Sequence, residues 1–133
     1  MHVLAPVDGS PCSLHALEFA VELTERFDGT LDVVHVGDPD AEATEQLLET
    51  AREVCAGHDV DATFEAVAET DSQESRLRYA SKVGAQLLAI ADERDVDHIV
   101  MGTHGREGVD EYILGSAAKA VLKSNAYPVT ILP

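Results

Sequence analysis

Five short apolar runs alternate with four segments of helical periodicity along this chain, and this alternation limits the fold more than any other feature of the sequence. The runs are His2–Val7, Leu31–Val36, Ala62–Ala68, His98–Met101 and Tyr127–Pro133. Strands separated by helices predict a parallel sheet with helices on both faces, because each parallel connection needs a crossover. We therefore expect an α/β fold, an open five-stranded parallel sheet, in a single domain over residues 1–133.

The same topology predicts where a ligand would bind. In open parallel sheets, ligands lie at the carboxyl ends of the strands, beside the point where the strand order reverses. We expect the loops after His2–Val7 and after His98–Met101 to flank that point. The first of these loops leads into a helix that should begin at Ser10 and Pro11, a favourable N-cap followed by a favourable first helical residue.

A glycine-rich loop follows the fourth apolar run. Gly102, Gly105, Gly115 and Ser116 form the spacing G-x2-G-x9-G-S. Glycine lets backbone N–H groups approach a ligand closely, and Gly115-Ser116 opens a helix whose N-terminus favours an anion. The patterns GxxxxGK(S/T) and GxGxxG are absent, so the loop is neither a Walker A loop nor a dinucleotide fingerprint. The spacing predicts a phosphate-binding loop of another kind.

This loop resembles the signature of the universal stress protein family, in its nucleotide-binding class. Gly102, Gly105, Gly115 and Ser116 match the signature G-x2-G-x9-G-(S/T), and the opening VLAPVDGS resembles the family's first strand and turn. The resemblance covers nearly the whole chain and is weak only in residues 41–82. It implies the strand order 3-2-1-4-5, a homodimer, and a bound adenine nucleotide (ATP, ADP or AMP), with Mg²⁺ arriving on the nucleotide.

The resemblance also assigns residues to the nucleotide. Pro6 and Asp8 would meet the nucleoside, the Val36 backbone the adenine, residues 102–106 the ribose and phosphates, and residues 115–118 the phosphates. The full set is Pro6, Val7, Asp8, Val36, Gly102, Thr103, His104, Gly105, Arg106, Gly115, Ser116, Ala117 and Ala118. From the residues alone, Asp8 could instead only cap its turn, and His104 could be merely solvated. Arg106 is the cation of an otherwise acidic loop and is the expected side-chain contact to phosphate.

Two parts of the chain depart from the family pattern. Ala117 and Ala118 stand where the family often has bulkier or hydroxylated residues, so one hydroxyl contact could be lost. The segment Glu69–Lys82 is longer than the usual connection, and an alternative alignment places the third strand at Arg76–Ser81. Three of the nine basic residues fall in this segment, so we expect it to border the nucleotide or a partner subunit unless it is only a solvated loop.

Composition limits the partners and the surroundings. The net charge is −16 and the chain has three lysines, which argues against nucleic acid as a partner, because phosphate backbones need clustered lysine and arginine. No run approaches the ~20 apolar residues of a membrane span, and we expect a cytoplasmic protein. A dispersed, acidic, lysine-poor surface suits a salt-rich cytoplasm. A halophilic source is therefore one hypothesis, and an ordinary acidic protein is the other.

The sequence favours binding over catalysis. The loop has no lysine to reach terminal phosphates, and neither a Walker-B acid nor an arginine finger is recognisable. We expect an ATP-binding stress-response or regulatory protein with slow or absent hydrolysis, and no metal site formed by the protein alone. The alternatives are a dimeric interaction module without nucleotide and a small electron-transfer flavoprotein of related topology.

The last apolar run, Tyr127–Pro133, suggests how a homodimer would form. A strand at a sheet edge leaves backbone N–H and C=O groups unpaired, and VTIL carries no lysine or bulge to protect it. The resemblance implies that two such strands pair antiparallel across a twofold axis. We expect a homodimer held largely by this segment.

Overall fold

The computed structural model describes residues 1–70, 81–104 and 114–133. The strands are β1 (His2–Pro6), β2 (Thr30–Val36), β3 (Asp61–Val67), β4 (His98–Gly102) and β5 (Val129–Leu132). The helices are α1 (Pro11–Arg26), α2 (Glu42–Cys55), α4 (Lys82–Glu93) and α5 (Ser116–Lys123). Every strand lies within two residues of its expected bounds. Among the described residues, no helix combines the length and the apolar character needed to cross a bilayer.

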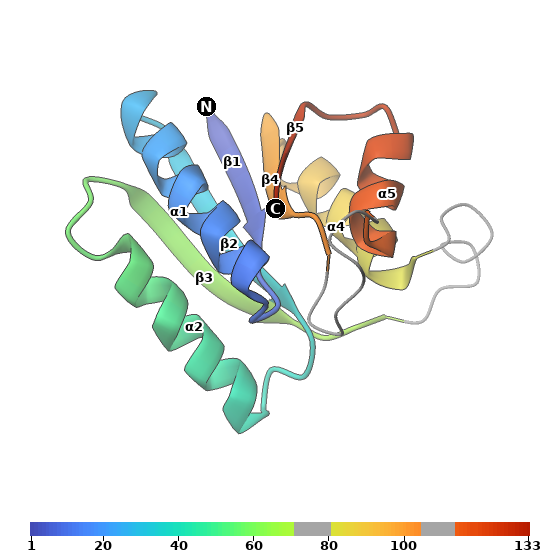
Figure 1. Ribbon diagram of the computed structural model, residues 1–133, viewed down its shortest axis with the longest axis horizontal. Helices are drawn as coiled ribbons and strands as arrows, with labels where there is room; N and C mark the ends of the chain where they lie inside the picture. Colours follow the sequence, from blue (N-terminus) through green and yellow to red (C-terminus); the bar gives the residue numbers. More distant parts are fainter. Residues whose placement is uncertain (71–80, 105–113) are drawn as a thin grey trace.

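All five strands form one parallel sheet in the order β3-β2-β1-β4-β5 (Figure 1). This order confirms the expected architecture, with Asp61–Val67 as the third strand. Residues 71–80, on which most of the alternative placement of that strand falls, lie outside the described residues. The strand order reverses between β1 and β4, so the carboxyl ends of these two strands flank the usual ligand position of the topology.

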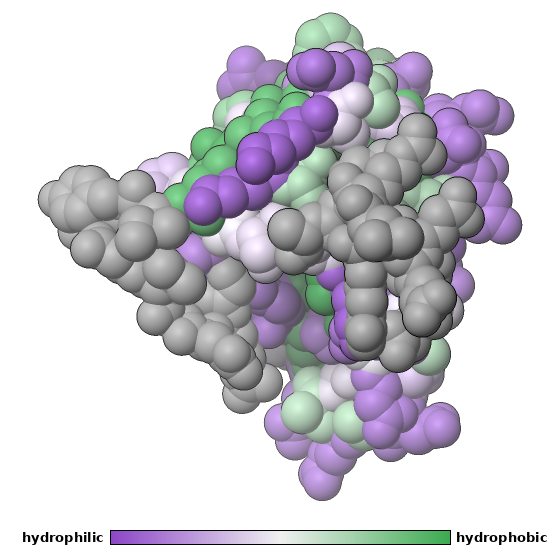
Figure 2. Space-filling model, turned by 90° about the vertical axis from the view of Figure 1, so that its right-hand side faces the viewer, coloured by the Kyte–Doolittle hydropathy of each residue, from purple (hydrophilic) through white to green (hydrophobic). Residues whose placement is uncertain are grey.

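Each face of the sheet carries its own hydrophobic cluster. On one face, α1 and α2 pack on the sheet through a cluster that includes Val3, Ala16, Leu17, Val21, Leu31, Val33 and Ala51. On the other face, α4 and α5 pack through a cluster that includes Leu4, Val34, Leu87, Ile90, Ile99 and Val121. Successive residues of β1 thus enter opposite clusters, as expected for a strand buried on both faces. Figure 1 shows α1 and α2 side by side in front of the sheet. Figure 2 shows the molecule from the side of α5, and on this side hydrophobic and hydrophilic residues are mixed on the described surface.

Serine side chains cap the N-termini of α1 and α4, whereas α5 begins without a side-chain cap. Ser10 accepts a hydrogen bond from the N–H of Ser13, and Pro11 is the first residue of α1, as the sequence predicts. Ser81 caps α4 in the same way by accepting from the N–H of Gly84. At the start of α5, Gly115 provides no side-chain cap. The first backbone N–H groups of α5 therefore receive no acceptor from a capping side chain, and they can donate hydrogen bonds to a different acceptor.

A charged cluster ties the start of β1 to β2, to β3 and to the end of α4. The Asp32 carboxylate accepts from Thr63 Oγ1 at 2.7 Å and from Arg94 Nη1 at 3.2 Å, and it lies 2.9 Å from His2 Nε2. Arg94 also donates to Glu65. Burial alone would raise the pKa of Asp32, but the hydrogen bonds from Thr63, Arg94 and His2 and the charge of His2 together lower it below its usual value.

Asp32→Asn should reduce the free energy of unfolding at neutral pH by about 1–3 kcal/mol, because Arg94 loses its partly buried charged acceptor. A carboxyl whose folded-state pKa is depressed stabilises the protein above its unfolded pKa of ~3.9, and this stabilisation is lost as the pH falls through the folded-state pKa. The difference between the wild type and the variant should therefore be constant near neutrality and shrink below about pH 4. Urea unfolding across this range measures it, and a gap that does not change with pH would contradict an electrostatic origin.

Candidate functional site

A cleft of about 240 Å³ opens at the carboxyl edge of the sheet, between the ends of β1 and β4. The described residues that the resemblance assigns to the nucleotide all line it: Pro6, Val7, Asp8, Val36, Gly102, Thr103, His104, Gly115, Ser116, Ala117 and Ala118. Gly105 and Arg106, the other two, lie outside the described residues. Segments far apart in the sequence thus meet at the position that the topology predicts.

Six residues outside the set that the resemblance assigns also line the cleft. They are Ser13, His35, Ser81, Val83, Leu87 and Met101. Ser81 is the N-cap of α4 and belongs to the segment Glu69–Lys82, which we expected to border the nucleotide or a partner subunit. Leu87 and Met101 are core residues, and an apolar pattern does not reveal which core residues border a cleft.

The lining of the cleft is of two kinds. Val7, Val36, Val83, Leu87 and Met101 contribute apolar surface. Hydroxyl groups, His104 and the N-terminal end of α5 contribute polar surface, and His104 Nδ1 lies 3.0 Å from Thr103 Oγ1. A ligand that combines an apolar ring with an anionic group would match both kinds of surface.

Hydrogen bonds fix Asp8 at the rim of the cleft. Its Oδ1 accepts from the N–H of Ser10 at 2.9 Å and from the Ser10 hydroxyl, and its own N–H donates to Ser13 Oγ at 3.3 Å. Just before it, the carbonyl oxygen of Val7 lies 2.8 Å from His35 Nδ1. Asp8 therefore caps its turn, as one of the two interpretations of this residue expects, and it lines the cleft as well.

Gly102 brings the end of β4 against the first turn of α1. A Cβ atom at Gly102 would lie 2.6 Å from Cys12 Sγ and 3.0 Å from the backbone nitrogen of Ser13. The Cys12 thiol is buried and donates to the carbonyl oxygen of His104 at 3.0 Å. The first glycine of the signature is therefore needed for this close approach of strand and helix, and the approach also positions the start of the glycine-rich loop.

Acidic side chains are missing from the first turns of the three helices whose N-terminal ends reach the cleft. The helices α1, α4 and α5 have none there, whereas α2, which does not line the cleft, has Glu42 and Glu45. This pattern occurs in a chain with 25 acidic residues among 133. The N–H of Gly115 donates to the Thr103 carbonyl oxygen at 2.6 Å, which places the start of α5 beside β4. Since helix N-termini carry partial positive charge, this edge of the sheet favours an anion.

Few titratable side chains line the cleft among the described residues. Asp8, His35 and His104 are the titratable residues among the described lining, which contains no lysine or arginine. In the part of the chain that the structure describes, no three His, Cys, Asp or Glu side chains gather as a metal site would require. What these residues supply is shape, hydrogen bonds and the dipole of α5.

Comparison with known proteins identifies the family. The model of the universal stress protein family matches residues 1–133, and the chain belongs to this family. A universal stress protein of Methanocaldococcus jannaschii is 28% identical over 138 residues, which covers 98% of this chain and 80% of that relative.

Solved structures with similar folds belong to the same family. A universal stress protein in complex with cAMP has a TM-score of 0.77 at 22% identity, covering 99% of this chain and 95% of its own. The universal stress protein from Archaeoglobus fulgidus in complex with dAMP has a TM-score of 0.72 at 19% identity, covering 100% of this chain and 98% of its own. At this level of identity, these likenesses establish the fold.

Proposed function

We propose that this protein binds an adenine nucleotide in the cleft and acts as a nucleotide-responsive regulatory protein. The observation that carries the proposal is the N-terminus of α5, which reaches the cleft without a side-chain cap and without acidic neighbours in its first turn, in a chain of net charge −16. A phosphate group would accept hydrogen bonds from the N–H groups that no side chain caps.

Adenine is the base proposed for the apolar part of the lining. Val36, Val83 and Met101 offer aliphatic and thioether surface to a flat ring. The relatives of similar fold that were solved with cAMP and dAMP support this choice. ATP, ADP and AMP are all candidates for this chain.

Binding with slow or absent hydrolysis is the proposed chemistry. The described lining has no lysine or arginine to stabilise a transferring phosphoryl group. Asp8 is the carboxylate of that lining, and one of its oxygens is engaged by Ser10, so Mg²⁺ would be held mainly by phosphate oxygens and water. The role of Arg106 as a phosphate contact stays a prediction, because Arg106 lies outside the described residues.

Identifying the ligand directly tests the proposal. Denaturing the purified protein and analysing the supernatant by mass spectrometry should reveal any co-purified nucleotide. Calorimetric titration of the ligand-free protein should then show that ATP or AMP binds at least tenfold more tightly than GTP, a difference of ~1.4 kcal/mol. Absence of binding by every adenine nucleotide would favour the nucleotide-free interaction module, and binding of FMN by a yellow protein would favour the flavoprotein.

We also propose that the protein is a homodimer formed through Tyr127–Pro133. Among the described strands β5 pairs with β4 alone, and its four side chains are half-buried. Antiparallel pairing with the β5 of a second copy would satisfy this edge. Light scattering should give twice the chain mass of 14.2 kDa, and truncation after Asn125 should abolish the dimer. A full-length monomer at tens of micromolar in high salt, where charge repulsion is screened, would contradict the proposal.

The cytoplasmic location and the halophilic source stay predictions from composition. If the acidic surface is adapted to salt, the melting temperature should rise steadily from low to molar KCl, because screening relieves the repulsion among the excess negative charges. Thermal melting over this range measures the effect. A melting temperature that is independent of KCl would favour an ordinary acidic protein.

A further inference from the structure

A second groove lies on the other side of the turn that holds Asp8. It measures about 400 Å³ and runs between the N-terminal ends of α1 and α2, where Asp8, Leu14, His35, Asp38, Thr44 and Leu47 are among the residues that line it. Asp8 and His35 also line the nucleotide cleft. The turn at Asp8 is therefore a wall common to the two sites, and we call this second site the α2 groove.

The α2 groove combines apolar surface with polar groups that can form further hydrogen bonds or ion pairs. Leu14 and Leu47 contribute the apolar part, and Asp8 and Asp38 contribute carboxylates. Thr44 is only 5% exposed, and no described residue forms a hydrogen bond with its hydroxyl group. Among the described residues no buried side-chain oxygen or nitrogen lacks a hydrogen-bond partner, so the Thr44 hydroxyl group reaches the solvent of the groove and can bond to a ligand there. The groove therefore offers apolar surface, carboxylates and a hydroxyl group to a partner.

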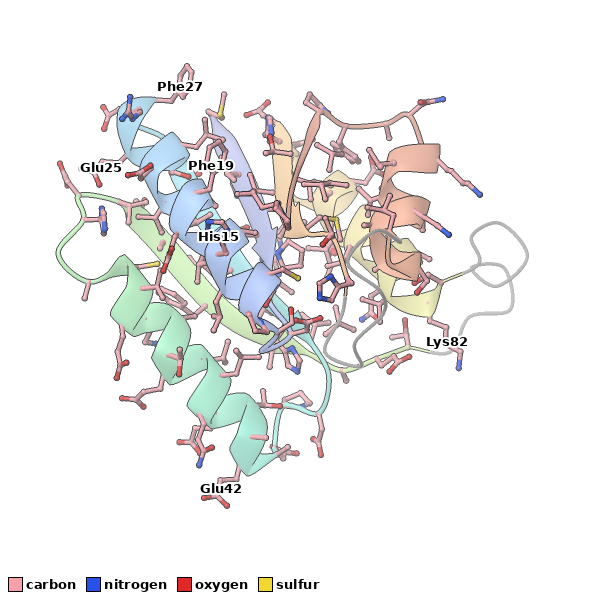
Figure 3. All side chains as sticks on the ribbon, in the orientation of Figure 1. His15, Phe19, Glu25, Phe27, Glu42 and Lys82 are labelled. Atoms are coloured by element: carbon pink, nitrogen blue, oxygen red, sulfur yellow. The ribbon has the colours of Figure 1, made fainter. Side chains whose placement is uncertain are left out.

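A line of glutamates runs along the exposed face of α2, and its members alternate in the sequence with residues of α2 that line the groove. Glu42, Glu45, Glu49 and Glu53 are spaced three or four residues apart, so they lie on one face of the helix, and all four are exposed. Figure 3 labels Glu42 at the N-terminal end of α2, with its side chain directed away from the protein. We call these four residues the glutamate stripe.

No described cation pairs with the glutamate stripe. Arg52, the basic residue of α2, lies over the ring of Phe64 at 5.3 Å, and none of the ion pairs among the described residues includes a stripe glutamate. Like charges four residues apart destabilise a helix by a few tenths of a kcal/mol per pair. Glu42 and Glu45, in the first turn, also interact favourably with the helix dipole, whereas Glu49 and Glu53 lie beyond that turn and do not offset this repulsion.

The acidic residues are also distributed unevenly along the chain. Residues 1–70, which include α1 and α2, contain 16 acidic and two basic residues, whereas residues 71–133 contain nine acidic and seven basic residues. A surface adapted only to salt would not need this imbalance. An uncompensated negative field beside a partly apolar groove is complementary to a positively charged partner.

We propose that the α2 groove and the glutamate stripe dock a basic, extended segment of a partner protein. An apolar side chain of that segment would occupy the groove beside Leu14 and Leu47, with lysine or arginine side chains over the stripe. Glutamates four residues apart on a helix are separated by ~6 Å along the axis, and alternate residues of an extended chain by ~6.6 Å. The matching segment therefore has its basic residues at alternate positions.

Docking and nucleotide binding should influence each other through the wall at Asp8. This part of the inference depends on the proposed function. Because coupling between two sites is reciprocal, a peptide that changes the nucleotide affinity by some factor has its own affinity changed by the same factor.

A labelled peptide of sequence LSKSKSKS, together with the reversed sequence, is the probe for docking. Fluorescence anisotropy near physiological ionic strength, where the Debye length is ~8 Å, gives the dissociation constants. The double variant Glu45→Gln/Glu49→Gln should weaken peptide binding at least tenfold. It should fold about as well as the wild type, because the loss of the favourable interaction between Glu45 and the helix N-terminus is partly offset by the removal of a like-charge pair from α2.

The matched control is Glu18→Gln/Glu22→Gln, which removes two exposed glutamates from α1. It should change peptide affinity less than twofold, and replacing the peptide's leucine with serine should weaken binding to the wild type. Equal losses in the two double variants would show that only net charge matters and would overturn the proposal, as would no binding of either peptide. Oligomer mass that falls when peptide is added would instead assign the groove to a second copy of this chain.

The first measurements are made without nucleotide, so they stand whether or not the protein binds one. Repeating them with saturating ATP or AMP should change the peptide affinity by the same factor by which the peptide changes the nucleotide affinity. Peptide binding that is unaffected by a nucleotide shown to bind would overturn the coupling alone. Failure of every nucleotide to bind would overturn the proposed function and the coupling together, and the docking result would be unaffected.

Discussion

Replacing Ser116 with aspartate should reduce the affinity for ATP or AMP at least 100-fold, which is ~2.7 kcal/mol, without destabilising the protein. Ser116 is the exposed first residue of α5 and lines the cleft. A carboxylate placed there would face the phosphate, and two like charges ~4 Å apart at an effective dielectric constant of ~20 repel by about 4 kcal/mol. The same carboxylate interacts favourably with the helix dipole and should stabilise the folded protein by ~0.3–1 kcal/mol.

Ser116→Asp should weaken nucleotide binding and stabilise the folded protein, so a loss of binding in this variant cannot be caused by unfolding. Ser116→Asn is the matched control, because it has the size of aspartate without the charge, and it should weaken binding far less. Calorimetric titration measures the affinity, and urea unfolding measures the stability. Unchanged nucleotide affinity in Ser116→Asp would refute the assignment of the phosphate to the start of α5.

Gly102→Ala should lower the free energy of unfolding by about 2–3 kcal/mol and abolish nucleotide binding at ordinary protein concentrations. The new Cβ would lie 2.6 Å from Cys12 Sγ and 3.0 Å from two backbone atoms of Cys12 and Ser13. Backbone atoms in the first turn of a helix cannot move aside without disturbing the cap at Ser10. Both β4 and the turn at Asp8 would shift, and these two segments form opposite sides of the reversal point in the sheet.

A second substitution shows whether this steric account is correct. Cys12→Ala removes the nearest atom but leaves the backbone contacts, so Gly102→Ala should cost less in the Cys12→Ala background than in the wild type. Urea unfolding of the four proteins of this cycle measures the coupling. Strict additivity of the two changes would mean that Gly102 is required for a reason other than its contact with Cys12.

Local signals made the fold predictable. Apolar runs of strand length and the Ser10-Pro11 pair are each read from a few consecutive residues, and the structure confirms the strands and the start of α1. The sheet order, which the structure also confirms, is implied by the resemblance to the universal stress protein family. The glycine spacing also directed attention to residues that line one cleft. Their roles toward a nucleotide stay predictions.

Contacts between distant segments could not be predicted in this way. Gly84 looks like an ordinary glycine in a helical segment, yet a Cβ there would lie 2.6 Å from the Cβ of Ala120 and 3.1 Å from the Ala117 carbonyl oxygen. Ala117 and Ala120 of α5 therefore meet a close approach of α4, and Ala117 is one of the two alanines that depart from the family pattern. The sequence shows that these residues are small but does not show which helix they meet.

The position of β1 has a consequence for synthesis of the protein. Of the strands of this sheet, β1 leaves the ribosome before the others and lies at the centre, so β2 can pair with it early, whereas β4 begins only at residue 98. Because synthesis proceeds at ~5–20 residues per second, the edge of β1 that pairs with β4 stays unpaired for several seconds. The cleft is complete only when the first turn of α5 has emerged as well. A bound ligand can therefore protect the finished protein from unfolding, but it cannot guide the first steps of folding.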